Sequence, residues 1–170
     1  MFIILETLLK LFDRDLQRLE EEISLYQSEE ALWRVSGEIK NPAGNLCLHL
    51  CGNLQHYIGT HLGRTSYVRN RDNEFAAKGI SKADLIAEVQ KTKQVVREAL
   101  ETLKPSSLES EYPEKVFDYP MTTAYFLIHL NSHLNYHLGQ INYHRRLIAQ
   151  VIGDPVVGDR SAAQNSVGGI

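Results

Sequence analysis

The sequence predicts an all-α protein, a four-helix bundle with a long connection between the second and third helices. Apolar residues recur at three- and four-residue steps over four long stretches, which is typical of amphipathic helices. Helix-capping patterns stand at the ends of several stretches, and strand-like alternation is scarce between them. With 43% hydrophobic and 23% charged residues in 170, the chain has the composition of one ordinary globular domain.

The first two long helices are expected in the first third of the chain. The first runs from about Glu6 to Tyr26, where leucines line one face and charged residues line the other. A short helical turn is expected over Glu29–Trp33. The second long helix is expected from Asn41, as N-cap, with Pro42 at its first position, and it continues to about Gly63.

The third and fourth long helices have clear boundaries in the sequence. Ser81-Lys-Ala-Asp84 resembles a capping box and opens the third helix, which ends before Pro105. The fourth begins near residues 120–123 and ends before Gly153. Residues 64–80 and 105–119 are long and loop-like. We therefore expect one domain over residues 1–152 and a flexible C-terminal tail over residues 153–170.

Charge and hydropathy exclude several classes of partner. The formal net charge of −3 leaves no excess of positive charge to bind nucleic acid. No run of about 18 apolar residues is present, so no membrane span is expected and the cytoplasm is the expected location. Cys47 and Cys51, four residues apart on an expected helix, suit neither a disulfide nor a zinc finger and are expected to be reduced core residues.

Histidines cluster in the fourth helix. His129, His133, His137 and His144 fall within an arc of roughly 80° on a regular helix. The second helix carries His49 and His56 on one face. Two imidazoles at i and i+4 with a third from a facing helix can hold one metal ion and leave positions open for a substrate. The alternative is that these histidines only pack and hydrogen-bond in the core.

Two familiar kinds of metal site are excluded by sequence pattern. No glutamate is followed three residues later by histidine, so the paired motifs of di-iron carboxylate bundles are missing. No His-Glu-x-x-His occurs, so a zincin-type protease is not supported. Among metal sites, a mononuclear one built from histidines remains.

Three segments resemble the DinB-like superfamily, and within it a branch of small bacterial proteins. They are LHLCGNL at 48–54, RNRDNEF at 69–75 and HLNYHLGQI at 133–141. The resemblance implies a divalent metal, with zinc or nickel favoured, and frequent homodimers. Carried over by position, it implies that His49, His133 and His137 are the metal ligands, with His56 as the fallback ligand on the second helix. Residues expected to support the ligands or line a pocket are Asn53, His56, His129, Tyr136 and Gln140.

The resemblance also implies candidate functions. The leading one is a metal-dependent enzyme that transfers a low-molecular-weight thiol to an electrophilic substrate, although no catalytic residue is assigned. Alternatives are metal-assisted hydrolysis and a non-catalytic metal- or ligand-binding dimer of a stress response. The charged segment Arg69–Phe75 is expected to be a structural loop at a dimer contact or pocket rim. Its arginines could instead bind a carboxylate on the thiol.

Overall fold

A computed structural model describes residues 2–152, and this part of the chain is all-helical, as predicted. Four long helical segments are α1 (Phe2–Ser24), α3 (Ala43–Leu54) continued by the π-helix η1 (Gln55–Thr60), α5 (Lys82–Thr102) and α6 (Thr123–Ile152). The short elements are α2 (Glu29–Trp33), α4 (Arg71–Ala76) and the 3₁₀ helix η2 (Pro105–Leu108). The predicted tail, residues 153–170, lies outside the described residues.

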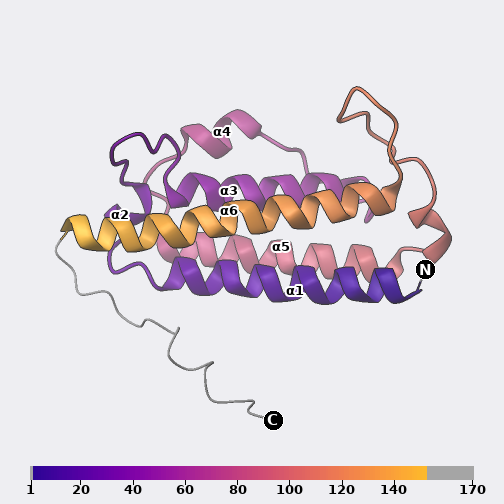
Figure 1. The fold of residues 1–170 in the computed structure, drawn as a ribbon, viewed down its shortest axis with the longest axis horizontal. Coiled ribbons are helices and arrows are strands. Elements are labelled where there is room, and N and C mark those ends of the chain that lie inside the picture. Colours follow the sequence, from indigo (N-terminus) through magenta and orange to yellow (C-terminus); the bar gives the residue numbers. More distant parts are fainter. Residues whose placement is uncertain (1, 153–170) are drawn as a thin grey trace, which may run out of the picture.

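The long helices pack side by side (Figure 1). Helix α1 contacts α5 and α6, and α3 contacts the same two helices from the opposite side. Helices α3 and α5 run in the same direction, so the connection between them must cross the length of the molecule. No described helix combines the length and apolarity needed to cross a membrane.

The core lies between these helices, because each contributes one apolar face. Helix α1 shows the simplest case, since its buried positions recur at three- and four-residue steps. Fully buried apolar side chains of the four long segments include Phe12, Leu16, Leu19, Leu50, Leu54, Ile58, Leu85, Leu100, Phe126, Leu134 and Ile141.

Helix α3 is buried on nearly every face. Eleven of its residues are buried, because α4 covers the side that α5 and α6 leave open. Asn45 fixes this cover, since its side-chain amide donates to the carbonyl oxygens of Glu74 and Ala77, both at 2.9 Å. Polar side chains on α3 therefore lie in a protein interior rather than in solvent.

Most predicted boundaries agree with the structure within a few residues. Ser81 caps α5 as predicted, with its hydroxyl accepting from the backbone N–H of Asp84. Helix α1 begins before Glu6, and the N-cap of α3 is Pro42 rather than Asn41.

The two predicted loops contain short helices. Helix α4 lies within residues 64–80 and η2 within 105–119. Both helices are too short to show a recognisable apolar period.

Candidate metal centre

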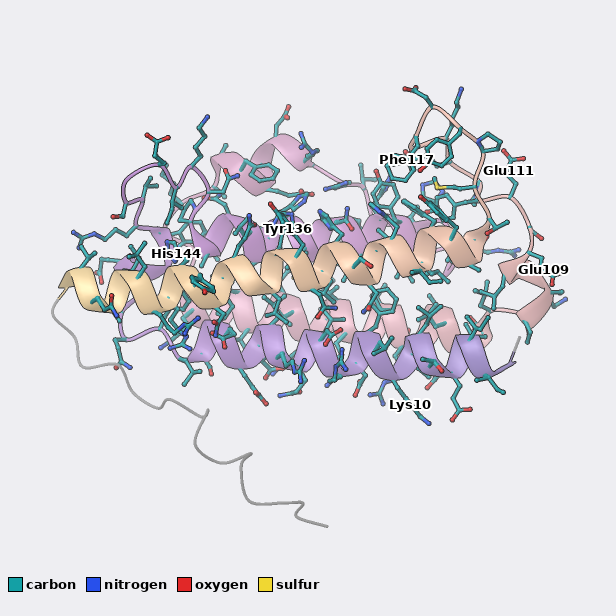
Figure 2. The ribbon with its side chains drawn as sticks, in the orientation of Figure 1. Lys10, Glu109, Glu111, Phe117, Tyr136 and His144 are labelled. Atoms are coloured by element: carbon teal, nitrogen blue, oxygen red, sulfur yellow. The ribbon has the colours of Figure 1, made fainter. Side chains whose placement is uncertain are left out.

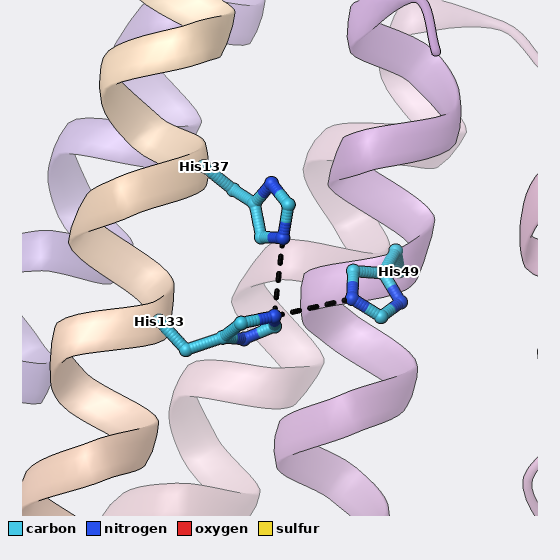
Figure 3. Close-up of side chains that lie close together, drawn as sticks. All are labelled: His49, His133 and His137. Carbon is cyan, nitrogen blue, oxygen red and sulfur yellow. Dashed lines mark hydrogen bonds between the residues drawn. The ribbon is translucent and has the colours of Figure 1, made fainter. Parts of the chain in front are cut away.

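The structure brings together the three histidines predicted as ligands. His49 comes from α3, and His133 and His137 come from consecutive turns of α6 (Figure 3). The Nε2 atom of His133 lies 3.4 Å from that of His49 and 3.1 Å from that of His137. Four-coordinate zinc with bonds of about 2.0–2.1 Å separates its ligand nitrogens by roughly 3.3 Å. The spacing therefore fits one tetrahedral metal ion.

Glu74 fixes the tautomer of His49, that is, which ring nitrogen carries the proton. Its Oε2 lies 2.9 Å from His49 Nδ1, and a carboxylate oxygen can only accept, so Nδ1 carries the proton. The lone pair of His49 then sits on Nε2, facing the other two histidines. Partners that orient a ligand in this way raise the affinity of metal sites.

Glu74 forms a bidentate ion pair with Arg69. Arg69 donates to both carboxylate oxygens, at 2.8 and 2.9 Å. Burial raises the pKa of Glu74, but the hydrogen bonds from His49 and Arg69 outweigh it and bring the pKa below its usual range. The carboxylate stays charged although it is only 5% exposed.

Gln140 accepts a hydrogen bond from His137, as Glu74 does from His49. The amide oxygen of Gln140 lies 2.6 Å from His137 Nδ1, so that nitrogen donates and the lone pair is left on Nε2. Gln140 was predicted to support the site, and it lies one turn beyond His137 on α6. Two of the three converging nitrogens thus present lone pairs.

His133 completes the set. Burial, followed by the nearby His137 and His49, lowers the pKa of His133 to about 4, so it is neutral at pH 7. Its Nε2 could donate one proton to only one of its two neighbours, and its buried Nδ1 has no hydrogen-bond partner. Hydrogen bonding alone therefore leaves an excess of acceptors at the centre, which a cation would satisfy.

Close packing brings Glu74 up to α3. A Cβ atom added at Gly52 would lie 2.2 Å from Glu74 Oε1, so only glycine leaves room for the carboxylate beside this helix. The ring of Phe75 also packs against His49, with a distance of 4.9 Å between the two ring centroids. Residue 52 and the segment 69–75, both within the motifs noted in the sequence, thus form one unit with His49.

Other residues predicted to support the site have different surroundings. Asn53 is buried, and its Oδ1 accepts no hydrogen bond. The ring of His129 stacks between Phe126 and His133, with centroid distances of 5.8 and 6.3 Å. Tyr136 is 64% exposed near the middle of α6, with its ring edge-on to His137 (Figure 2).

Two of the histidines singled out by the sequence pattern lie away from the centre. His56, proposed as the fallback ligand, instead contacts Glu114, because two helical turns separate it from His49. His144 lies toward the C-terminal end of α6 (Figure 2), where Nδ1 accepts from the Tyr26 hydroxyl at 2.7 Å and Nε2 donates to the Arg34 carbonyl at 2.9 Å. His144 is a fully hydrogen-bonded structural residue.

The sequence leaves open whether Arg69 and Glu74 belong to a structural loop or bind a ligand. Their pairing places them behind His49 rather than on a pocket rim. The available signal was a glutamate five residues after an arginine, inside one of the segments that resemble the DinB-like superfamily. It was weak because the sequence alone does not show that α4 covers α3.

Cys47 and Cys51 are buried and unpaired. Their hydrogen bond to one another and burial raise the pKa of Cys47 well above its usual range. Both are core residues, as predicted, and neither is grouped with the three histidines.

Comparison with known protein families identifies the family of this chain. Residues 11–141, which include all three histidines, match the profile of the DinB superfamily, a family associated with metal binding. Comparisons with curated proteins and with solved structures gave no significant match. The match covers most of the chain, and the chain therefore belongs to the DinB superfamily.

Proposed function

We propose that His49, His133 and His137 bind one divalent transition metal, zinc or nickel, and that the protein is a metal-dependent enzyme that transfers a low-molecular-weight thiol to an electrophile. The observation that carries this proposal is the convergence of three Nε2 atoms, among which hydrogen bonding can supply at most one donor. His133 and His137 are only half-buried, so a ligand could approach from their side. When bound, the metal would hold a thiol as thiolate near neutral pH.

The chain's own thiols do not supply the nucleophile. Cys47 and Cys51 are buried among core residues, and the raised pKa of Cys47 keeps its thiol protonated at neutral pH. A thiol that reacts at the centre must come from solution. This supports a transferase with a small thiol as co-substrate.

Arg71 is a candidate for binding a carboxylate on that thiol. Its guanidinium lies over the Phe75 ring, 5.3 Å from the centroid, and the same ring packs on His49. Arg69 is not available to bind the carboxylate of a thiol, because its guanidinium already donates to both carboxylate oxygens of Glu74. Arg71 is exposed and forms no ion pair with any described residue.

The test is a conjugation assay on zinc- or nickel-loaded protein. Monochlorobimane would serve as electrophile, with cysteine and with cysteamine, which lacks the carboxylate. We expect conjugation above the uncatalysed rate, faster with cysteine, and its loss in the His133→Ala, His137→Ala variant. Gly139→Ala on the same helix is the control, because nothing lies within 4 Å of the added methyl group.

Failure of the metal-loaded parent to conjugate any thiol would contradict the transferase. Ester hydrolysis by the same protein without thiol would instead favour the hydrolytic alternative. A tightly bound ion with no activity of either kind would favour a binding protein.

We also propose that residues 1–152 form a four-helix bundle and that the protein is a homodimer. The ring of contacts from α1 to α5, α3, α6 and back supports the bundle. An exposed apolar stripe on α6 supports self-association. Its residues are Tyr125, Ile128, Tyr136, Tyr143, Leu147 and Val151. Analytical ultracentrifugation would test the dimer, and Ile128→Glu with Tyr136→Glu should give a monomer.

A further inference from the structure

A second cluster of metal-ligating side chains lies away from the three-histidine centre. Glu114 Oε2 lies 3.0 Å from His56 Nε2 and 2.7 Å from His61 Nε2. One oxygen and two imidazole nitrogens, from segments more than 50 residues apart, thus meet at one point. The histidine side chains are 24% exposed and that of Glu114 is 37% exposed, so the cluster lies near the surface.

The π-helix η1 creates the histidine pair. In a regular α-helix, residues five apart point about 140° away from each other. In η1 the backbone N–H of His61 instead donates to the His56 carbonyl, an i to i+5 bond of 3.3 Å that widens the turn. The two rings come to lie 4.9 Å apart. Single π-turns of this kind are frequent at functional sites.

Glu114 is presented to this pair by an anchored loop. The loop between η2 and α6 is closed at its base by the bond from Tyr112 N–H to the Met121 carbonyl, at 2.9 Å. The Tyr112 hydroxyl then donates to the Tyr57 carbonyl at 2.7 Å, which ties the loop to η1. The position of Glu114 beside the histidines therefore follows from backbone anchoring and not only from its own contacts.

Hydrogen bonding does not fully account for the cluster. Among the described residues, Glu114 forms ion pairs with the two histidines and with no lysine or arginine. His61 Nε2 is buried and has no hydrogen-bond partner among the described residues, although Glu114 Oε2 lies 2.7 Å away. A cation bound by both atoms would satisfy this nitrogen and the carboxylate together.

We propose that His56, His61 and Glu114 form a second divalent-metal site, separate from the three-histidine centre. Two imidazoles and one carboxylate are a ligand set that proteins use for zinc, and nitrogen-rich sets of this kind also suit nickel and cobalt. Glu114 would withdraw by a few tenths of an ångström to admit an ion with bonds of about 2 Å, which its exposed side chain permits.

An ion here would also connect the loop to η1. That loop carries Phe117, whose ring packs against His129 at 5.0 Å, and His129 stacks in turn on His133. The second site would thus fix the segment that packs beside the first centre. This proposal does not rest on the thiol-transferase function.

The test uses the His133→Ala, His137→Ala variant, which lacks the first centre. After dialysis against a chelator, this variant should bind one equivalent of Zn²⁺ in competition with a chromophoric chelator. Adding Glu114→Gln should weaken that binding at least tenfold. Glu111→Gln, an exposed glutamate in the same loop, is the matched control and should leave binding unchanged.

A second readout assigns the ligands even if the double variant folds poorly. In the parent, ring ¹⁵N shifts of His56 and His61 should move as a second equivalent of Zn²⁺ is added, while those of the fully bonded His144 should not. Glu114→Gln in the parent should reduce the stoichiometry from two equivalents to one. Unmoved His56 and His61 shifts, or unchanged stoichiometry in Glu114→Gln, would overturn the proposal.

Discussion

Glu74 combines two tasks in one side chain, since it accepts from His49 and pairs with Arg69 while buried beside α3. We predict that Glu74→Gln weakens zinc binding by about 10- to 100-fold, because the amide is a poorer acceptor and cannot hold the Nδ1 proton as firmly. Competition with a chromophoric chelator measures this. Asp72→Asn, an exposed change on α4, is the control. Equal affinity in the Glu74→Gln variant and the parent would show that Glu74 does not act through His49.

His144 gives the structure a pH dependence at a position remote from the three-histidine centre. Burial lowers the pKa of His144, and the hydrogen bond to the Arg34 carbonyl only partly opposes this. The folded-state pKa thus lies below the value of about 6.5 expected in the unfolded chain. His144 therefore contributes stability above that pH, and the contribution is lost as the pH falls toward and through the folded-state pKa.

The measurement is urea unfolding of metal-free protein at pH 7.5 and pH 5.5. The parent should lose more unfolding free energy on acidification than His144→Gln, which cannot titrate at this position. Contributions that the two proteins share cancel in the comparison. A His144→Gln variant with the same loss as the parent would show that His144 does not cause the pH dependence.

At the scale of the elements, the sequence predicts long helices well and short ones poorly. The regular spacing of apolar residues predicts α1 because one face of that helix is buried, and Ser81 predicts the start of α5 because its hydroxyl caps locally. The π-helix η1, which packs against α5, leaves no comparable pattern in the sequence. This is why His61, which η1 places beside His56, was missed.

Two helical glycines provide a matched test of how closely α4 and α3 must approach. Gly52→Ala should displace the Glu74 carboxylate from His49 and weaken zinc binding by about tenfold. Gly139→Ala, with open space around it, should leave zinc binding unchanged and raise stability by about 1 kcal/mol through helix propensity. Zinc titration and thermal unfolding of both variants measure these effects. Full zinc affinity in Gly52→Ala would mean that Glu74 can move without loss.

At the scale of the whole molecule, the three-histidine centre joins helices that are distant in sequence. The His-x-x-x-His spacing on α6 was sufficient to predict one half of the centre, because i and i+4 residues share a helical face. The choice of His49 over His56 came from the family resemblance, since both lie on the same face of the second helix. Only the register between α3 and α6 shows which of them meets His133.

Because the centre joins α3 to α6, metal binding should stabilise the whole fold. An ion at a free concentration 100 times its dissociation constant adds about 2.7 kcal/mol to the unfolding free energy if the unfolded chain does not bind it. For a domain of this size, that corresponds to a rise in Tm of roughly 5–11 °C. We predict such a rise when zinc is added to the metal-free Glu114→Gln variant, in which the second proposed site is disabled.

The matched comparison is the same variant with His133→Ala and His137→Ala added, which should show no rise. Excess chelator should return the Tm of the zinc-loaded variant to its metal-free value. Differential scanning calorimetry measures all three states on one scale. An equal rise in both variants would place the stabilising ion somewhere other than between α3 and α6, because His133 and His137 provide the α6 side of the centre.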